Sequence, residues 1–116
     1  MLNDIEDIMI GATNTSVADI VPYRLVDISS VTGEFEMAIG TSGGVNVGII
    51  MDACVIGDKQ AVLMSGIGKV LASGTVTAGE HVECAAGLVL TSTTPASYIG
   101  VALSTGTDVL VDVWLK

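Results

Sequence analysis

Short runs of apolar, mostly β-branched residues alternate with small and polar residues along most of the chain. From Val17 onward the runs are separated by Gly, Ser, Thr, Asn and Asp, which favour turns. The expected strands lie near residues 20–27, 34–39, 45–51, 60–65, 68–73, 81–85, 87–91, 97–103 and 108–115. About nine short strands in one small domain predict an all-β fold, either a small β-barrel or a β-sandwich.

A weak internal repeat supports this interpretation. The segment VGII at residues 47–50 is followed by a turn and AVLM at 61–64, and IGVA at 99–102 is followed by a turn and VLVD at 109–112. A glycine inside the first strand of each unit, Gly48 or Gly100, predicts a bend or a close backbone approach. The glycine-rich segments at residues 43–44 and 66–69 lack the spacing of a phosphate-binding loop and are expected to be turns.

The first 15 residues differ from the rest. Asn3 and Glu6 have the spacing of a helix capping box, and the apolar residues of this segment fall on one helical face. The following segment, GATNTS, is small and polar and is expected to be flexible. We therefore expect an N-terminal arm over residues 1–15, joined to a single β-rich domain over residues 16–116. The alternative is a frayed terminus with no role.

Composition adds an expectation about association. Half of the 116 residues are hydrophobic, and 13 acidic plus 4 basic residues leave 17 charged side chains to cover the surface. A mean hydropathy of +0.71 is high for a small monomer, so we expect a subunit that buries part of its surface against partners. No apolar run reaches the roughly 18–20 residues of a membrane-spanning helix, so a membrane is not an expected partner.

The net charge of −9 excludes nucleic acid as an expected partner, because such a surface repels phosphate backbones. The N-terminus carries acidic residues where a signal peptide would be basic, which predicts synthesis and residence in a cytoplasm. Two cysteines, Cys54 and Cys84, are too few for a disulfide framework and are expected to be reduced, buried thiols.

The candidate chemistry is sparse. His81 and Cys84 have an H-x-x-C spacing, but a structural zinc site needs four ligands, and in a strand these two side chains point to opposite faces. We expect an exposed His81, a buried Cys84 and no metal site. No G-x-S-x-G motif precedes an expected helix, and Glu80 and Glu83 disfavour a thiolate at Cys84. We therefore expect a non-enzymatic protein with no catalytic residue, no cofactor and no small-molecule substrate.

Four segments carry a resemblance to a known family. In chain order they are ADIVPYRLVDISS, GVNVGIIMDA, VLMSGIGKVLASGTVTAGEHVECAAGLVL and YIGVALSTGTDVLVDVWL. Together they resemble the capsid decoration proteins of tailed bacteriophages, also known as head-stabilising or cement proteins. The resemblance covers residues 18–116, and its most recognisable parts are the block from Val62 to Gly79 and the closing IGVAL element.

This resemblance implies a structural virion protein without a cofactor. Such a protein is made in the host cytoplasm, binds the major capsid protein on the outer surface of a bacteriophage head, often as a homotrimer, and stabilises the head lattice. An N-terminal segment commonly reaches the capsid in this family. The residues expected to contact the capsid are therefore the apolar side chains of the arm: Leu2, Ile5, Ile8, Met9 and Ile10.

Two other functions stay open. The segment GKVLASGTVTAGEHV is similar to a strand-turn-strand of chaperonin-10 barrels, although the chain lacks the lysine-rich character and the mobile loop of that family. A phage tail or fibre module that binds a host glycan is the second. It is disfavoured by an aromatic content of 3%, because sugar rings stack on Trp and Tyr.

Overall fold

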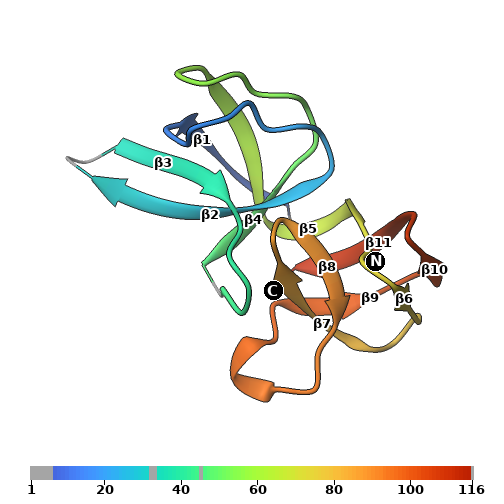
Figure 1. The fold of residues 1–116 in the computed structure, drawn as a ribbon. Coiled ribbons are helices and arrows are strands. Elements are labelled where there is room, and N and C mark those ends of the chain that lie inside the picture. The colour runs from blue at the N-terminus through green and yellow to red at the C-terminus, as the bar shows by residue number, and fades with distance from the viewer. Residues whose placement is uncertain (1–6, 32–33, 45, 116) are drawn as a thin grey trace.

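The computed structural model describes residues 7–31, 34–44 and 46–115, and residues 1–6, 32–33, 45 and 116 lie outside this description. The described residues form eleven β-strands, one short 3-10 helix, η1 (Pro95–Ser97), and no α-helix (Figure 1). The expected all-β fold class is confirmed. Among the described residues, no helix has the length and apolar character needed to span a membrane.

The strands follow one another along the chain with short connections. They are β1 (Ile8–Asn14), β2 (Arg24–Val31), β3 (Glu34–Ile39), β4 (Val47–Ile50), β5 (Lys59–Leu71), β6 (Thr75–Val76), β7 (His81–Ala85), β8 (Leu88–Thr91), β9 (Gly100–Ala102), β10 (Gly106–Thr107) and β11 (Leu110–Leu115).

Five of these strands close into a barrel in the order β1-β3-β2-β4-β5, which closes because β1 pairs with both β3 and β5. The β1–β3 pair is parallel and the other pairs are antiparallel, so the barrel is mixed. The sheet continues beyond β5 through β11, β9, β7 and β8, which we refer to as the second lobe (Figure 1). A bridge between Ala72 and Val89 brings β8 back to the residue that follows β5.

The long strand β5 joins the two parts. Its first half pairs with β1 and β4, and its second half, from Gly66 to Leu71, pairs with β11. Two strands with a turn at residues 66–69 were expected here, and this expectation is wrong. Gly66 has a φ of +126°, a conformation that glycine adopts without a side-chain penalty, so the strand changes direction without losing its ladder.

In strands β2, β4 and β5, residues that are adjacent in the sequence are buried in two different cores. Leu25, Ile49 and Leu63 belong to the core of the second lobe. Their sequence neighbours belong to the core of the barrel: Val26 follows Leu25, Ile50 follows Ile49, and Val62 precedes Leu63. Because side chains alternate between the two faces of a strand, both faces of this part of the sheet are covered. This explains why β4 is a continuous apolar run that is buried throughout.

The helix expected before Gly11 is wrong for the described residues 8–10, which begin strand β1 (Ile8–Asn14). An isolated helix of this length is marginal in water, whereas β1 gains hydrogen bonds to two strands and buries Ala12 and Asn14 completely. The expected flexibility of GATNTS is likewise wrong for its first four residues, which are part of β1. Asn3 and Glu6 lie outside the described residues, and a capsid-contacting function for the expected arm stays a prediction.

Two further positions refine the expected pattern. The strand expected over 20–27 begins at Arg24, because Tyr23 adopts a φ of +62° that interrupts extended backbone.

The close approach predicted at the two repeat glycines, Gly48 and Gly100, is confirmed. A Cβ atom on Gly48 would meet the Val62 side chain, and one on Gly100 would meet the carbonyl oxygen of Trp114.

Candidate functional site

The buried side chain of Asn14, at the end of β1, holds two long loops at one end of the barrel. Its Nδ2 atom donates hydrogen bonds to the carbonyl oxygens of Ala18 at 3.1 Å and Cys54 at 3.0 Å. Its Oδ1 atom accepts hydrogen bonds from the backbone N–H of Ser16 at 3.0 Å and the hydroxyl of Ser16 at 2.6 Å. Every hydrogen-bonding atom of this amide, which is 0% exposed, therefore has a partner.

The two loops, residues 15–23 and residues 51–58, are also joined to one another. The backbone groups of Ile20 and Cys54 exchange two hydrogen bonds of 2.8 and 2.9 Å. The Ile56 N–H donates to the carboxylate of Asp19 at 3.0 Å. The loops run side by side along the end of the barrel in Figure 1, away from β6 and β10. They are braced loops with defined geometry, which distinguishes them from flexible connections.

Four large apolar side chains project from these braced loops into solvent. Val17 is 99% exposed and Ile56 is 51% exposed, and the other two are exposed to a similar degree as Ile56. We refer to this set as the loop patch, and its members are Val17, Val21, Val55 and Ile56. Exposed β-branched side chains on rigid loops are a feature of interaction surfaces, because little conformational entropy is lost when they bind.

The charges on the two loops are all of one sign. Asp19, Asp52 and Asp58 are exposed, and residues 15–23 and 51–58 contain no Lys, Arg or His. Arg24 and Lys59 directly follow the two loops in the sequence. The Arg24 guanidinium donates to the carbonyl oxygen of Pro22 at 3.0 Å, and the Lys59 stem lies beside Gly11 of β1. The two loops that carry the loop patch therefore hold three exposed carboxylates, and one cation follows each loop.

A second apolar surface lies on the second lobe and has a different charge pattern. Its exposed members are Ile67 of β5, Leu103, Val109 and Leu110. Lys69 and Asp112 lie on the same two strands as Ile67 and Leu110 and form an ion pair of 2.8 Å. The hydrogen bond to Asp112 is the larger cause of a raised pKa at Lys69, and the negative charge of Asp112 raises this pKa further. This surface therefore carries a balanced pair of charges.

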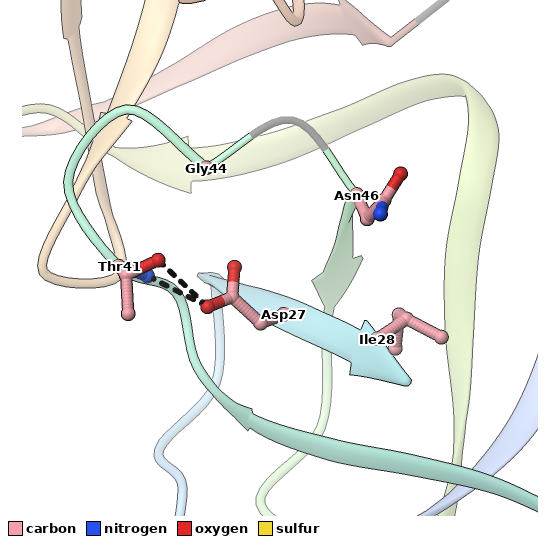
Figure 2. Close-up of a pocket in the computed structure, with 5 residues that line it drawn as sticks. All are labelled: Asp27, Ile28, Thr41, Gly44 and Asn46. Atoms are coloured by element: carbon pink, nitrogen blue, oxygen red, sulfur yellow. Dashed lines mark hydrogen bonds between the residues drawn. The ribbon is translucent and has the colours of Figure 1, made fainter. Parts of the chain in front are cut away.

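A shallow hollow of about 280 Å³ lies beside the β3–β4 connection and is lined by Asp27, Ile28, Thr41, Gly44 and Asn46. Figure 2 shows Asp27 and Thr41 pointing toward one another across it. The Asp27 carboxylate accepts hydrogen bonds from the Thr41 N–H at 3.1 Å and the Thr41 hydroxyl at 2.9 Å. Asp27 is the one ionisable residue in this lining. Its two hydrogen bonds to Thr41 fix the β3–β4 connection against β2.

The structure places His81 and Cys84 on opposite faces of β7, as expected. His81 is exposed and stacks on Tyr98, with ring centroids 4.3 Å apart and planes inclined by 4°. Cys84 is buried in the core of the second lobe and Cys54 in that of the barrel, and burial raises the pKa of both thiols. Among residues 7–31, 34–44 and 46–115, no three His, Cys, Asp or Glu side chains gather in a group that could hold a metal ion.

The comparisons with known proteins bear on the fold. No family model matches the chain, and no curated protein matches it. The fold is similar to that of a bacteriophage head fibre base. The match is to the crystal structure of the head fiber gp8.5 N base in bacteriophage phi29, with a TM-score of 0.78 and 17% sequence identity. It covers 96% of this chain and 95% of that chain, so it includes both the barrel and the second lobe.

The described members of the expected capsid-contacting set share β1 with Asn14. Ile8 and Met9 are exposed, whereas Ile10 is half-buried against the barrel core. Leu2 and Ile5 lie outside the described residues. β1 runs antiparallel to β5, so Ile8 lies opposite Ser65 and Thr13 lies opposite Lys59. Ile8 and Met9 are therefore at the end of β1 that is remote from the loop patch, and their contact with a capsid stays a prediction.

The sequence patterns did not identify the loop patch or Asn14. The tetrapeptide Val55-Ile56-Gly57-Asp58 contains a sequence signal for part of the loop patch. The Asp58 N–H donates to the Val55 carbonyl oxygen and closes a turn there. Turns are normally polar, and Gly57, with a φ of +86°, occupies a position that requires a left-handed residue. Val55 and Ile56 are therefore exposed apolar side chains at a turn where polar residues are usual.

Proposed function

We propose that this chain is a non-enzymatic structural protein of a bacteriophage virion that binds the outer surface of the head. The observation that carries the proposal is the similarity of the fold, over nearly its full length, to the head fiber gp8.5 N base. The braced, apolar loop patch supports it, because a rigid exposed surface is suited to docking on another protein.

We further propose that the chain acts as a cement protein and that it functions as a homotrimer. A protein that binds the closed lattice better than separated capsid subunits stabilises that lattice by mass action, and no catalysis is required. Three linked copies convert a modest affinity per contact into tight attachment. The second-lobe surface supports self-association, because its apolar side chains lie beside a Lys69–Asp112 ion pair whose charges compensate each other.

Binding to heads tests the proposal directly. Heads of the phage whose genome encodes the chain are prepared without it, and purified chain is added back. The expected result is density on the outer head surface, seen by electron microscopy, together with heads that withstand higher temperature. Sedimentation of the free chain measures the number of copies. Heptameric rings would favour a chaperonin-10-like function, and binding at tail tips would favour a host-binding module.

A further inference from the structure

We infer that the loop patch is the surface that docks on the capsid, and that its partner site is an apolar depression surrounded by Lys and Arg side chains. The inference rests on the proposed function, since it names the contact surface and the chemistry of its partner. Asn14 and the Ile20–Cys54 bridge hold the patch in place before binding, so its four apolar side chains are presented at a low entropic cost.

A second copy of this chain does not fit the loop patch. Contact between two copies of the same patch would bring Asp19, Asp52 and Asp58 against their equivalents, and like charges in a desolvated contact are destabilising. The cations in the described part of the chain also offer no complementary cluster. Lys69 is paired with Asp112, Arg24 donates to backbone carbonyl oxygens, and Lys59 is a single exposed cation at the start of β5. The occupant is therefore a different protein with a basic rim.

The loop patch is also distinct from the surface that the N-terminal segment would use. Ile8 and Met9 lie at the opposite end of β1, which at roughly 3.3 Å per residue places them about 17–20 Å from Asn14. Substitutions at the two ends of β1 therefore separate the two possible contacts. The loop-patch residues are exposed, so polar replacements there leave both cores unchanged.

The experiment measures binding of the labelled full-length chain to heads assembled without it. Val17→Ser and Ile56→Ser are each expected to weaken binding about tenfold, because burying a side chain of this size contributes roughly 1.5 kcal/mol or more. Phe35→Ser is the matched control, since Phe35 is 45% exposed on the β2–β3 hairpin. Its binding should stay within twofold of that of the unchanged chain. Thermal melts verify that each variant is folded.

The charge of the partner is tested with salt. Affinity should fall as salt is raised, and the double variant Asp52→Asn with Asp58→Asn should bind more weakly at low salt and show a smaller salt dependence. Glu34→Gln, which removes an exposed carboxylate from the hairpin, should leave the salt dependence unchanged. Tighter binding by the Asp52/Asp58 variant would contradict a basic partner.

The remaining outcomes distinguish the two proposals. If the unchanged chain binds heads and the Val17 and Ile56 variants bind equally well, the loop patch is not the docking surface, while the proposed function stands. If Ile8→Ser or Met9→Ser alone weakens binding, the contact is at the N-terminal end of β1. If Ile56→Ser changes the oligomeric state of the free chain, a second copy occupies the patch and the inference is wrong. Failure of the unchanged chain to bind heads would overturn both proposals.

Discussion

The side-chain amide of Asn14 donates a hydrogen bond of 3.0 Å to the carbonyl oxygen of Cys54, 40 residues further along the chain. This bond connects the end of β1 to the loop between β4 and β5. The backbone repeats the connection, because the Asn14 N–H donates to the Asp58 carbonyl oxygen at 2.9 Å and the Gly57 N–H donates to the Asn14 carbonyl oxygen at 2.8 Å. Asn14 therefore acts together with the Ile20–Cys54 bridge to hold the loops that carry the loop patch.

Replacing Asn14 should lower stability strongly. Asn14→Ala leaves the buried Cys54 carbonyl oxygen without its side-chain donor and opens a cavity, so we expect a loss of about 2–3 kcal/mol in the free energy of unfolding, measured with urea. Asn14→Asp should also destabilise, because a carboxylate cannot donate to the Ala18 and Cys54 carbonyl oxygens. Asn46→Ala, at an exposed position, should change stability by no more than about 0.5 kcal/mol.

Gly100 should not tolerate a side chain. A Cβ atom at this position would meet the backbone of Trp114 on the neighbouring strand β11, and backbone cannot move aside as a flexible side chain can. Gly100→Ala is therefore expected to cost about 2 kcal/mol or more of unfolding free energy. Gly11→Ala is the control, because its Cβ atom would meet only the flexible Lys59 side chain at 3.4 Å. Equal stability of the two variants would contradict the close approach.

Truncation from the N-terminus should have two distinct effects. Removal of residues 1–6 retains β1 and is expected to leave the strand signal in circular dichroism unchanged. Removal of residues 1–15 takes away β1 and Asn14, and with them the pairing that closes the barrel, so the melting transition should be lost or greatly lowered. A native-like melt of the shorter chain would show that the barrel does not need β1.

The two buried thiols should make stability fall in alkaline solution. Burial raises the pKa of Cys54 and Cys84 above the ordinary value of 9.0, so the folded chain holds these protons more tightly than the unfolded chain. Their contribution is complete below pH 9.0 and is lost as the pH rises through the raised pKa. Urea unfolding from pH 8 upward measures the decline. A variant with Ala at both positions should decline less steeply, and an identical decline would assign the effect to other groups.

The sequence by itself determined the all-β class, the positions of β3, β7 and β8, the close approach at Gly48 and Gly100, and the opposite orientations of His81 and Cys84. These features depend on local alternation and on glycine, and both can be read along a single strand. Only the tertiary structure decided that residues 8–14 form a strand, that β5 continues through Gly66, and that Asn14 braces the loop patch. Each of these depends on partners far away in the chain, such as the hydrogen bonds from Asn14 to Cys54 and from β1 to β5. Their free energy exceeds the weak local preference of a short segment for a helix or a turn.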